Sequence, residues 1–342
     1  MRKLLNTLYV TNPESYLARD GENVLVKMGD RPNFRIPVHN LEAIVTFGYS
    51  GASPALMQLC AERGVTLSFH RESGEFLARV QGAVKGNVLL RRRQYRMADD
   101  DHAVELARSF VFAKIANSRI VLNRGLRDHP AVIAIDVVKR ESDYMKRYLA
   151  KLLKLQSLDD VRGVEGDAAR RYFAALNELI LVNKNDFYVR GRSRRPPLDR
   201  MNAMMSYLYG VLRNDVTSAL ESVGLDPQVG FLHRDRPGRQ SLALDMMEEL
   251  RSYLVDRLVL SLVNRKQVDA TSFIRKENGA ILLKPELKKE LITAWQKRKQ
   301  EEIKHPFLNE KIPVGLLPYT QALILARYIR GDLDAYPPFL WK

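Results

Sequence analysis

Short runs of alternating apolar and polar positions dominate the first eighty or so residues. In residues 16–28, YLARDGENVLVKM, two such runs flank the Asp-Gly pair at 20–21. This pattern predicts a β-hairpin, because its turn needs residues that accept positive φ. Residues 65–80, VTLSFHRESGEFLARV, repeat the pattern around the Ser-Gly pair at 73–74. The sequence therefore predicts a β-rich N-terminal domain.

One short helix is expected inside this domain, in the segment SPALMQLCAERG. Ser53 can serve as its N-cap, Pro54 stands in its first turn, and Gly64 follows its last residue.

After VQGAVKGN, apolar residues recur at helical spacing and turn signals become sparse. We therefore predict an α+β fold with a boundary near residue 84, a small β-rich domain at 1–84 and a larger all-helical domain at 85–342. The helices are expected at about 101–123, 138–155, 165–182, 200–222, 241–263, 285–303 and 317–329.

The balance of charge points to a polyanionic partner. The 342 residues carry 55 Lys and Arg against 40 Asp and Glu, a net charge of +15. The 46% hydrophobic and 28% charged content is ordinary for a globular protein. Nucleic acid is the first candidate partner and an anionic membrane the second. The alternative is a basic surface that only keeps the protein in solution.

Neither a membrane segment nor a cysteine-based site is indicated. Apolar runs such as ELILV and ALILA fall far short of the roughly 20 residues that a membrane span needs. The N-terminus lacks the sustained apolar stretch of a secretory signal. Cys60 is the single cysteine, which excludes an internal disulfide and a cysteine zinc cluster. We expect a cytoplasmic protein.

The predicted helix at 241–263 places several carboxylates on one face. At 100° per residue, Glu248, Glu249 and Asp256 lie within about 60° of Asp245. Apolar side chains gather on the opposite side. A solvated acidic face near a helix N-terminus would give the same pattern.

Glu165 argues against the interpretation that all of these acids are simply exposed to solvent. It lies on the same helical stripe as Ala168, Tyr172 and Leu176, where an acid is costly to bury unless a charge or a metal compensates it. The alternative is that Glu165 stands at a helix start between two glycines and caps exposed amides. The pattern alone leaves both interpretations open.

His233 ends the apolar stretch PQVGFLH, just before an arginine-rich turn. A lone histidine is more often structural, but an imidazole beside two or three carboxylates makes a mostly oxygen site, which suits Mg²⁺ or Mn²⁺. Zinc would recruit more nitrogen or sulfur. In a basic protein, such an ion would neutralise charge at a phosphate and orient the attacking oxygen.

Arginines flank these residues and are candidates for DNA phosphate contacts. Arg194 and Arg195 lie in the basic loop NKNDFYVRGRSRRPP, and Arg234, Arg236 and Arg239 follow His233. The alternative for each of them is an ordinary solvated loop charge.

Taken together, the motifs resemble the CRISPR-associated adaptation integrase family, the metal-dependent nucleases that acquire spacers. The resemblance runs through GVEGDAARRYF, DRMNAMMSYLYGVL and GLDPQVGFLHRDRPGRQSLALDMMEELR, and it covers most of the chain. The C-terminal ARYIRGDLDAYPPFLWK further resembles the bacterial type I-C branch.

The resemblance implies a role for five residues. Glu165 matches the family's first metal-binding glutamate, His233 the ligand that closes the GFLH motif, and Glu248 the final acidic ligand. Asp245 matches a neighbouring accessory acid, and Tyr209 an aromatic hydroxyl near the active site. Many relatives have Asp where this chain has Glu248, a longer reach that alters metal distance but not the chemistry.

The resemblance also implies partners and an activity. The family forms a homodimer, for which we expect the N-terminal domain to serve, and two dimers bracket a small second adaptation protein. The implied substrates are double-stranded DNA fragments and a CRISPR repeat, into which the 3′-hydroxyl of the fragment attacks. Two alternatives stay open: a hydrolytic nuclease with the same ligands, and a non-catalytic nucleic-acid-binding scaffold whose acids only cap helices.

Overall fold

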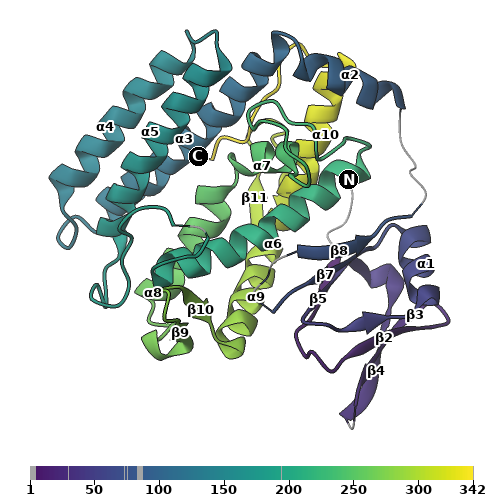
Figure 1. Ribbon diagram of the computed structural model, residues 1–342. Coiled ribbons are helices and arrows are strands. Elements are labelled where there is room, and N and C mark those ends of the chain that lie inside the picture. The colour runs from purple at the N-terminus through teal and green to yellow at the C-terminus, as the bar shows by residue number, and fades with distance from the viewer. Residues whose placement is uncertain are drawn as a thin grey trace. The chain divides into compact units, whose positions relative to one another are not determined.

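The computed structural model describes residues 5–29, 31–72, 74, 76–82, 88–193 and 195–341. The chain divides into two compact units (Figure 1), Met1–Gly86 with Lys288–Gln300, and Asn87–Leu287 with Glu301–Lys342. The boundary predicted at residue 84 lies outside the described residues. The helix that the sequence placed at 285–303, in the second domain, contributes most of its length to the first unit.

The first unit contains two four-stranded sheets and the expected helix α1 (Pro54–Arg63). Ser53 Oγ accepts a hydrogen bond from Leu56 N at 3.3 Å, and Gly64 takes the left-handed conformation, so both predicted ends of α1 are confirmed. One sheet has the order β1-β5-β7-β8: β1 (Asn6–Val10), β5 (Leu41–Phe47), β7 (Thr66–His70) and β8 (Phe76–Val80). The other has the order β4-β3-β2-β6: β4 (Arg31–Pro37), β3 (Asn23–Met28), β2 (Tyr16–Asp20) and β6 (Gly51–Ala52).

Both predicted hairpins correspond to antiparallel strand pairs. The turn between β2 and β3 contains Gly21, whose φ of +60° is the positive φ that the sequence pattern predicted for this hairpin turn. The β7–β8 pair is also antiparallel, although Ser73 of its connection lies outside the described residues. Side chains from both sheets and from α1 form the core of this unit, among them Leu17, Ile44 and Leu56. The β-rich N-terminal region is therefore confirmed.

The second unit is mostly helical. Its helices α3, α4 and α5 pack on one another and run side by side in Figure 1, and α6 packs against α7 and α10. Helix α2 was not predicted. The helices are α2 (Val88–Ala98), α3 (His102–Asp128), α4 (Ile135–Leu152), α5 (Leu158–Leu176), α6 (Arg200–Ser222), α7 (Ser241–Met247), α8 (Arg257–Asn264) and α10 (Leu317–Arg330), with α9 (Pro285–Gln300) shared between the units.

Short elements complete the second unit. Two small antiparallel sheets pair β9 (Phe273–Arg275) with β10 (Ile281–Leu283), and β11 (Glu302–Lys304) with β12 (Lys311–Pro313). Across the described part of the chain, no helix has the length and apolar character needed to cross a membrane.

Two differences from the predicted helices bear on the candidate site. Helix α5 begins at Leu158, where Ser157 Oγ accepts a hydrogen bond from Asp160 N at 3.1 Å. Glu165 is therefore two turns inside the helix, and the interpretation of Glu165 as a capping residue is wrong. The helix expected at 241–263 is broken: α7 ends at Met247, and a π-helical turn, η3 (Ser252–Asp256), precedes α8.

Candidate active site

Glu165 and Glu248, 83 positions apart in the sequence, converge on the ammonium group of Lys114. Lys114 lies on α3, Glu165 on α5, and Glu248 directly follows α7. Lys114 Nζ is 2.7 Å from Glu248 Oε2 and also forms an ion pair with Glu165 Oε1. The Glu248 side chain is 3% exposed and that of Glu165 25%. The solvated acidic face is therefore wrong, and a charged cluster stands in its place.

Cations hold Glu248 in its ionised form. Burial acts to raise the pKa of this carboxyl, but the positive charges of Arg251 and Lys114 outweigh it and lower the pKa to about 2. Arg251 Nη2 lies 3.2 Å from Glu248 Oε1. The other oxygen, Oε2, is buried and has the Lys114 ion pair, but accepts no hydrogen bond of good geometry from the described residues.

Asp245 fixes the position of His233 through contacts to its backbone and to ring atom Nδ1. One carboxylate oxygen, Oδ2, accepts hydrogen bonds from Phe231 N at 2.6 Å and Leu232 N at 2.9 Å. The other, Oδ1, accepts from His233 N at 2.9 Å and lies 2.6 Å from His233 Nδ1. Because a carboxylate only accepts, Nδ1 carries a proton, and the neutral ring keeps its lone pair on Nε2. This is the arrangement by which a carboxylate orients a metal-ligating histidine.

Residues of α5 also hold the GFLH turn (Gly230–His233) in place. Arg162 donates from Nε to Leu232 O at 2.7 Å and from Nη1 to Asp159 Oδ1 at 2.8 Å. Arg234 also donates to Asp159 Oδ1, at 2.9 Å. The turn that carries His233 is therefore tied both to the helix of Glu165 and to the helix of Asp245.

Tyr209 acts on this cluster through Arg251 rather than through its own hydroxyl. The hydroxyl donates to Asp256 Oδ1 at 2.5 Å, and Tyr172 donates to Asp256 Oδ2 at 3.0 Å. Arg251 lies over the Tyr209 ring at 5.1 Å, as does Arg192. The Tyr209 ring thus supports the guanidinium that pairs with Glu248.

Glu249, the third acid of the predicted face, serves a different purpose. Its carboxylate accepts hydrogen bonds from Gln321 Nε2 at 2.9 Å, from Phe339 N at 2.5 Å and from the Tyr336 hydroxyl. Asn117 on α3 donates to both Glu249 O and Phe339 O at 2.8 Å. Glu249 therefore anchors the C-terminal segment to the turn that presents Glu248.

The predicted DNA-binding arginines differ in exposure. Arg195, Arg234 and Arg236 are exposed and Arg239 is half-buried, whereas Arg194 lies outside the described residues. Arg239 Nη1 donates to Arg234 O at 3.5 Å.

The sequence analysis missed both cations of the cluster, Arg251 and Lys114, and Lys114 had a readable signal. It interrupts the buried stripe of Ala103, Ala107, Phe110 and Asn117 on α3, a position where a lysine signals a buried partner of opposite charge.

The residues fit a divalent cation in the nature and convergence of their donors. The carboxylates of Glu165 and Glu248 both contact the Lys114 ammonium group, which shows that they converge on a site for positive charge. Asp245 contacts Nδ1 of His233 and so does not use the Nε2 lone pair. Oxygen ligands with one imidazole suit Mg²⁺ or Mn²⁺. The described residues nevertheless include no group of three His, Cys, Asp or Glu side chains already arranged around one point. The Lys114 ammonium stands between the carboxylates instead.

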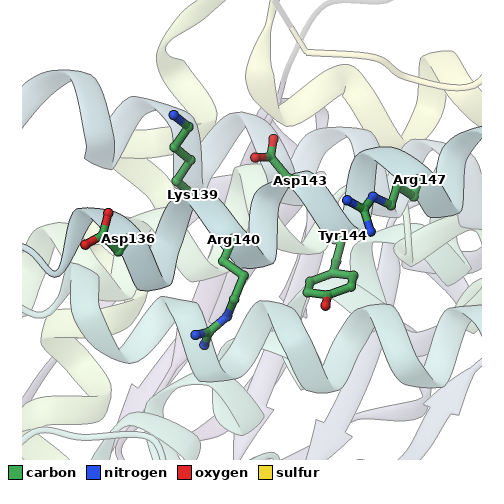
Figure 2. Close-up of a pocket in the computed structure, with 6 residues that line it drawn as sticks. All are labelled: Asp136, Lys139, Arg140, Asp143, Tyr144 and Arg147. Carbon is green, nitrogen blue, oxygen red and sulfur yellow. The ribbon is translucent and has the colours of Figure 1, made fainter.

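A surface pocket lies on α4 and contains none of these residues. Figure 2 shows its lining side chains projecting from this single helix. They mix three basic with two acidic groups, and we assign no chemistry to this pocket. The residues are Asp136, Lys139, Arg140, Asp143, Tyr144 and Arg147.

The model of the family described as CRISPR associated protein Cas1 matches residues 8–297. The chain belongs to the Cas1 family. It is 52% identical to the CRISPR-associated endonuclease Cas1 1 of Chlorobaculum tepidum over 343 residues, which covers 100% of both chains. The family resemblance inferred from the sequence motifs is thereby confirmed.

Two solved structures show the same fold. A casposase bound to integration product has 23% sequence identity and a TM-score of 0.85, with 99% of this chain and 95% of that chain covered. A chain of a Cas6-RT-Cas1–Cas2 complex has 21% identity and a TM-score of 0.81, with 100% of this chain and 36% of that chain covered. The type I-C branch stays a prediction.

Proposed function

We propose that this Cas1-family protein is a divalent-metal-dependent DNA endonuclease and integrase that inserts short double-stranded DNA fragments into a CRISPR repeat. The observation that carries the proposal is the convergence of Glu165 and Glu248, with His233 held by Asp245 in the tautomer that leaves the Nε2 lone pair for a metal. The endonuclease name of a relative 52% identical over the whole chain supports the activity. The casposase with its integration product supports strand transfer as the reaction type.

In this proposal Glu165, Glu248 and His233 would hold Mg²⁺ or Mn²⁺, and Asp245 orients His233. The bound ion would supply charge neutralisation at the scissile phosphate and a lower pKa for the attacking hydroxyl. Tyr209 supports Arg251, which keeps Glu248 ionised. We assign Tyr209 the role of a positioning residue, because its hydroxyl donates to Asp256.

The reaction is a transesterification. The 3′-hydroxyl oxygen of the fragment forms a new bond to phosphorus, and the phosphodiester bond of the repeat strand breaks. The attacking hydroxyl loses its proton, the leaving oxygen takes up one proton and becomes a 3′-hydroxyl of that strand, and no water is consumed. Arg194, Arg195, Arg234, Arg236 and Arg239 would hold the phosphates on either side, which is why we expect steep salt dependence.

The partners follow the family. We propose a homodimer that uses the N-terminal domain, and an assembly with a small second adaptation protein, in the cytoplasm. The Cas1–Cas2 complex among proteins of this fold supports the second partner.

Strand transfer of a short duplex into a supercoiled plasmid that carries a repeat tests the activity. With Mg²⁺ or Mn²⁺, His233→Ala and Glu248→Ala should each lower the rate more than about 100-fold, equivalent to roughly 2.7 kcal/mol of barrier. Arg108→Gln is the matched control, because Arg108 donates to Leu153 O and Leu155 O instead of the carboxylates. Full activity of either site variant would refute the assignment.

Two further experiments separate the alternatives. A fragment with a blocked 3′ end should abolish strand transfer but would leave a hydrolytic nuclease active. The Lys114 ion pairs are compatible with the scaffold alternative, since they give both acids a cationic partner without a metal. Isothermal titration with Mn²⁺ discriminates: a scaffold shows no heat of binding that depends on Glu165.

A further inference from the structure

The carboxylate pair lies in a cluster whose formal charges cancel. Glu165 and Glu248 contribute two negative charges, and Lys114 and Arg251 contribute two positive ones. The Lys114 side chain is 13% exposed and that of Arg251 12%, so solvent screens these pairs weakly. A divalent ion bound by both acids would leave this cluster with a net charge of about +2 unless one resident cation withdraws.

The two cations differ in how firmly they are held. Arg251 pairs with Glu248 at 3.2 Å and lies over the Tyr209 ring at 5.1 Å, and it occupies the turn next to the π-helical segment. Lys114 contacts the acids only by the tip of a flexible four-carbon stem, a compact charge that changes rotamer easily. Lys114 is also the group that bridges both acids. Its ammonium is therefore the cation that must move away when a metal ion binds between them.

We propose that Lys114 is a positioning residue that acts as a resident counter-ion. Its ammonium keeps Glu165 and Glu248 together before the divalent ion arrives, and it withdraws from between them when Mg²⁺ or Mn²⁺ binds. This inference rests on the proposed metal-dependent function. It explains why the acids already converge although no three-ligand group is formed in the described residues.

The inference predicts two effects of opposite sign. Without the ammonium, the buried Glu248 and the half-buried Glu165 face one guanidinium, so the metal-free protein becomes less stable. Without a competing cation, the same carboxylates bind a divalent ion more tightly. A lysine with a purely structural role would weaken both properties when removed. A lysine that only contacts DNA would change neither in the absence of DNA.

The experiment compares the full-length wild type with Lys114→Gln, and uses Arg108→Gln on the same helix as the control. Isothermal titration with Mn²⁺ in the absence of DNA should give K114Q a roughly tenfold or greater gain in affinity, which corresponds to about 1.4 kcal/mol. The melting temperature of K114Q in EDTA should fall by at least about 3 °C. R108Q should match the wild type in Mn²⁺ affinity.

A double variant guards against simple misfolding. Glu165→Gln combined with Lys114→Gln leaves Glu248 paired with Arg251, so its melting temperature in EDTA should lie above that of K114Q alone. Additive losses would overturn the inference, as would equal Mn²⁺ affinities of K114Q and the wild type. If K114Q and the wild type bind Mn²⁺ equally well while the wild type shows Mn²⁺-dependent strand transfer, the inference about Lys114 is wrong but the proposed function stands. Absence of that strand transfer in the wild type would remove the proposed function.

Discussion

Substitution of Asp245 by Asn should disable the site by changing the tautomer of His233. The carboxylate accepts four interactions: Phe231 N at 2.6 Å, Leu232 N and His233 N at 2.9 Å, and His233 Nδ1 at 2.6 Å. Asn has one carbonyl oxygen. If that oxygen serves Phe231 and Leu232, the amide NH₂ faces His233 and donates to Nδ1. The ring proton then moves to Nε2, which can no longer bind a metal.

The magnitude follows from the lost interactions. Two of the four contacts to the carboxylate lose an acceptor, and hydrogen bonds to charged groups contribute about 1.5–3 kcal/mol each. Because the new amide-to-Nδ1 bond offsets part of this loss, we expect about 2–4 kcal/mol of destabilisation. Loss of a residue that orients a metal ligand lowers metal affinity by about 10–100-fold.

Three measurements check this prediction. Long-range ¹⁵N–¹H correlation spectra report the His233 tautomer, urea unfolding reports stability, and Mn²⁺ titration reports affinity. Asp136→Asn is the control, because Asp136 is exposed on α4 and contacts none of the site residues. An Asp245→Asn protein with the wild-type tautomer, Mn²⁺ affinity and strand-transfer rate would refute the reasoning.

Three further predictions concern other parts of the same unit. Gly230→Ala should destabilise the folded protein and weaken Mn²⁺ binding, because the new Cβ would lie 2.7 Å from Asp245 Oδ2 and 2.8 Å from the Ser241 carbonyl carbon. Gly166→Ala is the control and should do neither, because a Cβ there would have nothing within 4 Å. Calorimetry and Mn²⁺ titration compare the two variants. Burial raises the pKa of Asp256 to about 6 against the hydrogen bonds from Tyr209 and Tyr172. The folded state therefore binds more protons than the unfolded state between pH 3.8 and about 6, so this group's contribution to stability falls by about 3 kcal/mol as pH rises through that window. Urea unfolding at pH 4 and pH 7 should show that Asp256→Asn lacks this contribution, and identical pH profiles would exclude it. Finally, each of Arg236→Gln and Arg239→Gln should reduce the slope of log affinity for duplex DNA against log salt by about 0.9, and unchanged slopes would remove them from the phosphate contacts.

Local patterns in the sequence predicted the elements that depend on local interactions. The β2–β3 hairpin needed only alternation and a glycine at positive φ. Helix α1 needed only Ser53 and Gly64 at its ends. The order of a β-rich and a helical region followed from the change in periodicity.

The site was predictable in its acids but not in its cation. For Glu165 on its apolar stripe, the pattern left open either a compensating charge or metal, or a capping role, and in the structure Lys114 supplies a charge. Lys114 lies 51 positions before Glu165, and single-sequence patterns do not pair residues at that separation. Its place on the buried stripe of α3 was nonetheless a readable signal.

The face assigned to the 241–263 helix was wrong for a geometric reason. The π-helical turn at Ser252–Asp256 breaks the steady 100° rotation, so Glu248 pairs with Lys114 whereas Asp256 accepts from the Tyr209 hydroxyl. Glu249 turns to the C-terminal segment. A periodicity that assumes an unbroken helix has no means of separating these three acids.

Anomalous diffraction from crystals grown with Mn²⁺ tests the central claim most directly, because one map locates the ion and its ligands together. The account predicts an anomalous site bound by Glu165, Glu248 and His233 Nε2, with the Lys114 ammonium withdrawn from between the carboxylates. An anomalous site elsewhere, or Lys114 still bridging both acids with Mn²⁺ in excess, would contradict it.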